Sequence, residues 1–153
     1  MVAHTEHEIV IDAPLELVWD MTNDIESWPR LFSEYSEATV LDRSGDAVRF
    51  RLALHPDENG KVWSWVSERR PDRATWTVRS QRVETGPFKY MWIYWEYLRE
   101  GTGVRLRWVQ DFEMKPQAPV SDAEMKARLD RNTPVQQRLV KEKVEAAARA
   151  AVG

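Results

Sequence analysis

The sequence lacks cysteine, long apolar runs and a strong excess of one charge. With no cysteine among 153 residues, the chain can form no disulfide and has no thiol nucleophile. No run reaches the roughly 18 consecutive apolar residues of a membrane-spanning helix, and the charged N-terminal residues do not form a signal peptide. Acidic and basic residues number 25 and 22 and are mixed along the chain, so there is no basic stripe for nucleic acid. These absences predict a soluble, cytoplasmic protein with no nucleic-acid or membrane partner.

Motifs of several enzyme classes are also missing. There is no glycine-rich phosphate loop, no nucleophile elbow and no paired set of metal ligands. Of the three histidines, His4 and His7 are near the N-terminus and His55 is at the end of an expected strand. Surface positions explain them better than metal binding or general base catalysis. The sequence therefore predicts no metal site.

Tryptophan, in contrast, is abundant, with eight residues in the chain. Trp is large and its N–H needs a partner, so cores are normally built from Leu, Ile and Val. Rigid aromatic side chains suit a cavity for a flat or extended organic ligand. They could equally pack a sheet, and composition alone does not choose between the two interpretations.

Alternation of apolar and polar residues predicts seven β-strands. The first covers residues 7–12, and turn-forming residues separate the others. Six strands with short connections are typical of an antiparallel meander. These six are expected at residues 37–42, 47–55, 61–69, 74–82, 90–99 and 104–114.

Helices are predicted on both sides of this meander. Residues 14–29 hold two short helices, the first starting at Pro14 and the second capped by Asn23 or Asp24. The C-terminal third is helical, and we expect a short helix near 121–131 and a long one over 134–150. Two matches to a capping box mark their starts, Ser121 with Glu124 and Thr133 with Gln136.

One strand, two short helices, six strands and a long helix is the element order of the helix-grip fold. This α+β architecture, also called START/Bet v 1-like, wraps a curved seven-stranded antiparallel sheet around a long C-terminal helix and leaves a cavity between them. The step from element order to fold is an analogy, although few small folds share this order. With no linker or repeat, residues 1–153 are expected to form one domain.

Strand alternation also predicts which side chains face that cavity. In residues 61–69, Trp63, Trp65, Ser67 and Arg69 share one face. Burying an unpaired guanidinium is costly, so Arg69 should meet a ligand oxygen, water or an acid; it could equally extend to the rim and pair with Asp or Glu. A mostly aromatic surface with few polar groups is typical of a small-molecule pocket. The remaining inward residues are Met91, Ile93, Trp95, Tyr97, Leu106, Trp108, Gln110, Phe112 and Met114.

Four segments of the chain resemble aromatase/cyclases of bacterial type II polyketide synthases. The resemblance is greatest to the single-domain group of the tetracenomycin and whiE spore-pigment type. It covers about residues 5–140 and weakens in the last helix. The segments are residues 28–35 (WPRLFSEY), 60–67 (GKVWSWVS), 82–88 (RVETGPF) and 107–116 (RWVQDFEMKP).

The resemblance implies a helix-grip fold with no metal and no redox cofactor. It implies a poly-β-ketone substrate bound as a thioester to an acyl carrier protein, with a minimal polyketide synthase as partner. The implied reaction is aldol closure of the first ring, usually between the ninth and fourteenth carbons, followed by loss of water. The family's arginine and tyrosine fall on Arg69 and Tyr35. Its cavity residues fall on Trp28, Phe32, Trp63, Trp65, Ser67, Phe88, Met91, Trp95, Trp108 and Gln110.

In this chemistry Arg69 would stabilise negative charge on an oxygen, and Tyr35 would donate the proton for dehydration. Gln136 stands where relatives carry a shorter amide, so it is expected to act only as a cap. The main alternative in the same fold is a non-catalytic carrier or chaperone for a hydrophobic small molecule, and a third is an interaction module with an empty cavity. A lipid carrier has little use for a buried arginine, so the sequence favours an enzyme.

Overall fold

The computed structural model describes residues 2–152, and within them it contains seven strands and three α-helices. After β1 (Ala3–Ile11) come three short helices, six strands and the long helix α3 (Asp122–Val152). The short helices are α1 (Leu15–Asn23), the 3-10 helix η1 (Ile25–Ser27) and α2 (Trp28–Leu31). The six strands are β2 (Tyr35–Ser44), β3 (Ala47–Leu54), β4 (Ser64–Asp72), β5 (Thr77–Arg82), β6 (Phe88–Glu100) and β7 (Gly103–Met114).

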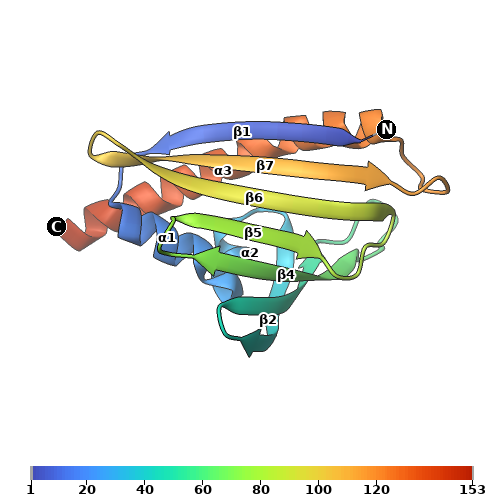
Figure 1. The fold of residues 1–153 in the computed structure, drawn as a ribbon, viewed down its shortest axis with the longest axis horizontal. Coiled ribbons are helices and arrows are strands. Elements are labelled where there is room, and N and C mark those ends of the chain that lie inside the picture. Colours follow the sequence, from blue (N-terminus) through green and yellow to red (C-terminus); the bar gives the residue numbers. More distant parts are fainter. Residues whose placement is uncertain (1, 153) are drawn as a thin grey trace.

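The strands form one antiparallel sheet in the order β1-β7-β6-β5-β4-β3-β2. The first strand therefore pairs with the last, with Ala3 opposite Phe112 and Ile11 opposite Val104. Figure 1 shows α3 running behind β1 and β7, with α1 and α2 on the same side of the sheet, behind β5 and β4. Val140 and Val144 of α3 are fully buried against this sheet. The architecture confirms the predicted α+β helix-grip fold, in which the second short helix is divided into η1 and α2.

The C-terminal helix differs from the prediction because it is not divided. α3 is continuous and contains Pro134, so the expected helix boundary between residues 131 and 134 is wrong, and Thr133 is not a cap. A proline inside a helix costs about 3 kcal/mol, which tertiary contacts on the following turn offset. There Gln137, 2% exposed, donates its amide to the carbonyl oxygen of His7 on β1 at 2.9 Å.

The predicted capping box at the start of α3 is confirmed. The backbone N–H of Glu124 donates to Oγ of Ser121 at 3.1 Å, and the N–H of Ser121 donates to the Glu124 carboxylate at 3.2 Å. The expected caps before η1 are wrong, because neither Asn23 nor Asp24 makes a side-chain cap there. Asn23 instead donates to the carbonyl of Trp19 within α1 and leaves its oxygen for another partner.

The strand expected at residue 61 begins at Ser64. The preceding loop is organised by Asp57, whose Oδ1 accepts the backbone N–H groups of Asn59 and Lys61 at 2.9 and 3.0 Å. Its Oδ2 accepts the indole N–H of Trp63 at 3.0 Å. Asp side chains that bind nearby backbone in this way hold turns. Trp63 is consequently 38% exposed, and its predicted place among the inward residues is wrong.

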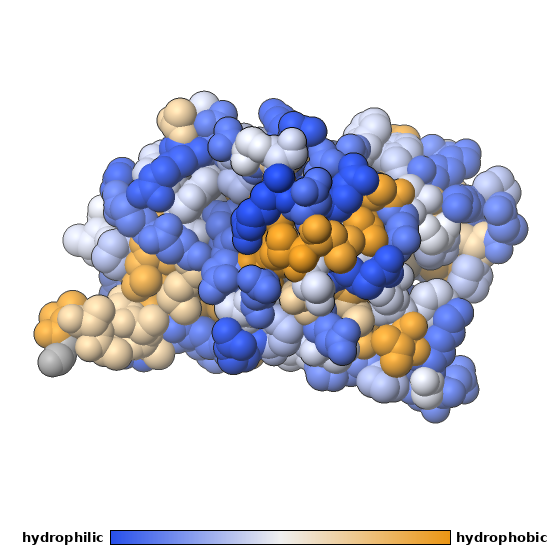
Figure 2. Space-filling model, turned by 90° about the horizontal axis from the view of Figure 1, so that it is seen from below, coloured by the Kyte–Doolittle hydropathy of each residue, from blue (hydrophilic) through white to orange (hydrophobic). Residues whose placement is uncertain are grey.

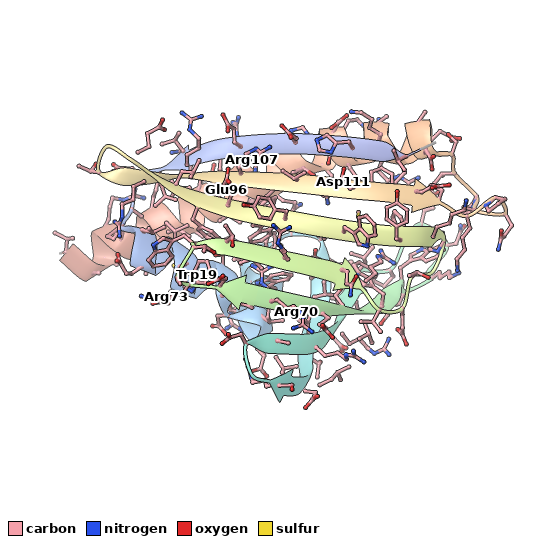
Figure 3. The ribbon with its side chains drawn as sticks, viewed as in Figure 1. Trp19, Arg70, Arg73, Glu96, Arg107 and Asp111 are labelled. Atoms are coloured by element: carbon pink, nitrogen blue, oxygen red, sulfur yellow. The ribbon has the colours of Figure 1, made fainter. Side chains whose placement is uncertain are left out.

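The outer face of the sheet is rich in ion pairs. Figure 3 shows Arg70, Glu96, Arg107 and Asp111 on the strands of this face. Arg107 pairs with Glu96 at 3.3 Å, and Arg70 pairs with Glu68 at 2.8 Å.

In the view from below, an apolar area is surrounded by polar residues (Figure 2). Residues 2–152 contain no helix long and apolar enough to cross a membrane, and no cluster of three or more His, Asp or Glu that could hold a metal ion.

Candidate active site

One charged side chain is buried at the centre of the fold. Arg69 of β4 is 2% exposed. Its Nε donates to Oδ1 of Asn23 on α1 at 3.1 Å, and its Nη2 has no hydrogen-bond partner among residues 2–152. No carboxylate in this range pairs with it. The alternative in which Arg69 reaches the rim and pairs with an acid is therefore wrong.

This environment favours binding of negative charge beside Arg69. Burial lowers the pKa of the Arg69 guanidinium to about 10, so the group remains charged at neutral pH. The hydroxyls of Tyr97 and Tyr35 lie near it but carry no charge there, because burial raises the pKa of both phenols. A cation without a counter-charge in an interior of low dielectric attracts an anion far more strongly than it would in water.

Aromatic rings surround the guanidinium of Arg69, whose central carbon lies 4.3 Å from the ring centre of Trp95 and 5.2 Å from that of Trp28. Trp28, Trp95 and Trp108 form a stack with centre distances of 6.1 and 4.4 Å and interplanar angles of 16° and 11°. Phe32 contacts both ends, at 5.1 Å from Trp28 and 5.9 Å from Trp108. The expected aromatic residues are present, but their rings contact one another, and the open cavity predicted from the sequence is not seen between them.

The interior reaches the surface beside Tyr35, Trp65 and Arg82, which are all half-buried. The ring centres of Tyr35 and Trp65 are 6.5 Å apart. The Arg82 guanidinium lies 4.0 Å from the Trp65 ring centre and 4.7 Å from that of Phe88, and burial lowers the pKa of Arg82 to about 10. The phenol of Tyr35 is close enough to Arg82 and Arg69 for both cations to oppose the rise of its pKa. Tyr35 therefore lies at the rim, near both arginines.

A polar network holds the segment that carries Tyr35. Gln136 of α3 accepts the backbone N–H of Ser33 at 3.1 Å and donates to the Ser33 hydroxyl at 2.9 Å. Asn132, one turn earlier, donates to Oε2 of Glu34 at 2.7 Å. Gln136 is thus a tie between α3 and the α2–β2 connection, and the expectation that it is only a cap is wrong.

A family model described as "Polyketide cyclase / dehydrase and lipid transport" matches residues 11–139. The chain belongs to this family. The resemblance to polyketide aromatase/cyclases that the four sequence segments predicted is thereby confirmed.

Relatives of this cyclase-family chain agree in sequence and in fold. A Streptomyces cyaneus protein named as a polyketide cyclase is 59% identical over 145 residues, which are 95% of each chain. The actinorhodin polyketide synthase bifunctional cyclase/dehydratase of Streptomyces coelicolor is 27% identical over 83% of this chain and 39% of its own length. The structure of the Zhui aromatase/cyclase from Streptomyces sp. R1128 superposes with a TM-score of 0.89 over 100% of this chain and 99% of that one, at 22% identity. This last likeness shows a shared fold.

In this member of the polyketide cyclase family, most predicted site residues meet in one cluster. Trp28, Phe32, Tyr35, Trp65, Arg69, Trp95 and Trp108 contact one another through the distances given above, and Ser67 is buried on the same face of β4. Phe88 and Met91 are also buried but belong to a second cluster with Phe112, Met114 and Met125. Gln110 accepts a hydrogen bond from the Thr5 hydroxyl at 3.0 Å, which engages its oxygen within the protein.

Two residues of the site, Asn23 and Glu34, were not predicted from the sequence. The sequence predicts helix capping for Asn23 and no role for Glu34, yet Asn23 binds Arg69 and Glu34 lies beside Tyr35. Tyr97 was expected to face inward, but its bond to Thr22 at 2.6 Å was not. Only Glu34 had a usable signal, since it directly precedes Tyr35 in a segment already singled out.

We expect Glu34→Gln to change the pH dependence of stability. Burial raises the pKa of the Glu34 carboxyl above its ordinary value of 4.5. A carboxyl with a higher pKa in the folded state costs stability as pH rises through that pKa, because the folded state resists the charge. Glutamine carries no charge and keeps an oxygen for Asn132. Urea unfolding should show that the wild type loses stability relative to Glu34→Gln as pH rises from 4.5 to neutrality. The control is Glu37→Gln at an exposed position, and the difference in stability between this variant and the wild type should stay the same over that range. Parallel curves for Glu34→Gln and wild type would contradict this.

Proposed function

We propose that this protein is an aromatase/cyclase that folds a poly-β-ketone chain bound to an acyl carrier protein and closes its first ring by aldol addition and dehydration. Membership of the polyketide cyclase family supports this proposal. The observation that carries it is Arg69, a buried cation among aromatic rings with no acidic partner in residues 2–152. Closure between the ninth and fourteenth carbons is part of the proposal and rests on the family resemblance.

The first task of the site is to hold the chain in one fold. A poly-β-ketone cyclises in several registers in water, and alignment of one carbon pair supplies much of the rate. The rings of Trp28, Phe32, Trp95 and Trp108 provide flat apolar walls that exclude water. Since these rings contact one another, the chain enters beside Tyr35 and Trp65 and separates them.

The second task is to stabilise charge. Aldol closure passes through an enolate and then an alkoxide, and a fixed cation in a dry site stabilises both. Arg69 suits this role because it is charged at neutral pH and Nη2 is free to donate. We assign it no proton transfer, because loss of its proton would remove the positive charge that stabilises the oxyanion. Arg82 at the rim is placed to attract an enolate oxygen toward the interior.

Tyr35→Phe is expected to slow ring formation by about 10²-fold while substrate binding changes little. Burial keeps the pKa of the Tyr35 phenol well above its ordinary value, so the proton stays available to an alkoxide or a leaving hydroxyl at all physiological pH. Phenylalanine keeps the ring that stacks on Trp28 at 5.8 Å. Rate measurement in a reconstituted synthase tests this. A variant as fast as wild type would mean that water or substrate supplies the proton.

The function itself is tested by adding the purified protein to a minimal polyketide synthase and analysing the products. We expect the mixture of spontaneous ring forms to narrow to one first-ring product. A non-catalytic carrier of a hydrophobic molecule would instead protect the chain and leave the product ratio unchanged. The buried charge of Arg69 argues against the carrier, because a hydrocarbon ligand would leave that charge uncompensated.

A further inference from the structure

Two buried side-chain nitrogens have no hydrogen-bond partner among residues 2–152: Nη2 of Arg69 and Nε1 of Trp108. An unpaired buried donor costs about 1–3 kcal/mol, and buried indole N–H groups usually find a partner. The buried Trp28, 5% exposed, follows that rule, because its indole N–H donates to the carbonyl of Thr22 at 3.1 Å. Trp108 is 6% exposed, so its free N–H is an exception that needs a cause.

The two unpaired donors belong to side chains that both pack against the ring of Trp95. Trp108 stacks on Trp95 at 4.4 Å, and the Arg69 guanidinium carbon is 4.3 Å from the centre of the same ring. Neither an indole nor a guanidinium can accept a hydrogen bond. A molecule that satisfies both must therefore carry at least two acceptor atoms, placed along an otherwise apolar surface.

We propose that Trp108 donates its indole N–H to one oxygen of the ligand while Nη2 of Arg69 binds a second oxygen of the same molecule. The inference rests on the proposed function and deepens it, because it defines what the interior selects. A chain with repeated ketone oxygens, such as a poly-β-ketone with its 1,3-diketone units, offers an acceptor for each of the two donors. A hydrocarbon chain of the same shape leaves both donors unpaired. Trp108 is then a specificity-determining residue through its N–H as well as part of the aromatic wall.

Two small probes of nearly equal shape separate these contributions. 1-Phenylbutane-1,3-dione carries two ketone oxygens, whereas butylbenzene carries none. In proton–nitrogen correlation spectra the indole N–H signals of the tryptophans are resolved, and the one that disappears in Trp108→Phe is that of Trp108. We expect this signal to move downfield when the dione binds to the wild type and to stay close to its position when butylbenzene binds.

Calorimetric titration of wild type and Trp108→Phe with both probes gives the second measurement. Loss of ring area weakens both probes alike, so the ratio of their affinities isolates the N–H. We expect the preference for the dione over butylbenzene to fall about tenfold in Trp108→Phe, which corresponds to one hydrogen bond. The matched control is Trp92→Phe, since Trp92 is 54% exposed on the outer face and should leave the ratio unchanged.

An unmoved Trp108 signal in the presence of bound dione, or an unchanged affinity ratio in Trp108→Phe, would overturn the inference. If Trp108→Phe does not fold, the Trp108 signal is assigned by elimination, from Trp92→Phe and the other tryptophan variants. The spectrum of the wild type with bound dione then tests the inference. These outcomes are distinct from failure of the proposed function. A wild-type protein that binds the dione through Trp108 but does not narrow the products of a synthase would refute the cyclase and leave this site intact.

Discussion

Arg69→Met is expected to make the protein more stable and far less able to direct ring closure. The guanidinium is desolvated, with one hydrogen bond to Asn23 and one nitrogen unpaired. Replacement of buried charged groups by apolar side chains of similar volume often stabilises a protein by 1–4 kcal/mol. Loss of the Asn23 bond and of the contact with Trp95 reduces that gain, so we expect about 1–2 kcal/mol in urea unfolding.

The same substitution removes the only positive charge that is buried within residues 2–152. Loss of one preorganised donor to a developing oxyanion lowers a rate by about 10²–10³-fold. We expect a loss of this size in first-ring formation in a reconstituted synthase, with a product mixture close to that obtained without the protein. Arg79→Met on the outer face is the matched control and should alter neither quantity much. A variant that is less stable than wild type, or that directs the ring normally, would refute the role of Arg69.

A substitution that raises stability and lowers activity identifies a charge that serves function and not the fold. An arginine kept for the fold would be paired, and its removal would destabilise by leaving a partner unsatisfied. The neighbours of Arg69 are instead uncharged: an amide oxygen, two indole rings and the hydroxyls of Tyr97 and Tyr35. The stability that the fold gives up at this position is consistent with a site built for a charge that the ligand brings.

Element order and strand alternation were readable from the sequence because they follow local rules. Alternation placed Trp65, Ser67 and Arg69 on one face of β4, and the structure buries Ser67 and Arg69 there. The same rule failed at Trp63, since alternation has meaning only inside a strand and Asp57 holds residues 57–63 as a loop. The turn formers in residues 56–60 indicate a loop, but no local pattern indicates that this loop continues to residue 63.

The errors in the helices have a different origin. Local propensity indicated a break before Pro134, and contacts distant in sequence overrode it: Gln136 binds Ser33, and Gln137 binds His7. Partners more than 100 residues away leave no trace in the local pattern. Asn23 and Arg69 are likewise far apart in sequence, so no local pattern could have paired them.

Trp95→Ala is expected to be the most destabilising single change among the tryptophans, and Trp63→Ala one of the mildest. Trp95 lies between Trp108 and the pair formed by Trp28 and Arg69, and it is 6% exposed. Truncation of a buried Trp costs about 3–5 kcal/mol. Trp63 loses one hydrogen bond and a contact with Lys61 at the surface, which amounts to about 1 kcal/mol. Both variants should remain folded, because domains are stable by about 5–15 kcal/mol, and urea unfolding measures the difference.

Free indole should restore much of what Trp95→Ala loses. An apolar space left by a truncated core residue binds a molecule of the missing shape, and a ligand that binds only the folded state stabilises it by about 2.7 kcal/mol at a hundredfold excess over its Kd. Indole should therefore raise the melting temperature of Trp95→Ala and have little effect on wild type or Trp63→Ala. This result would show that the stacked interior can be opened by a flat ligand without loss of the fold. If Trp95→Ala collapses around the space and indole has no effect, the rings serve as an ordinary core, and access of a polyketide chain to Arg69 would have to be by another route.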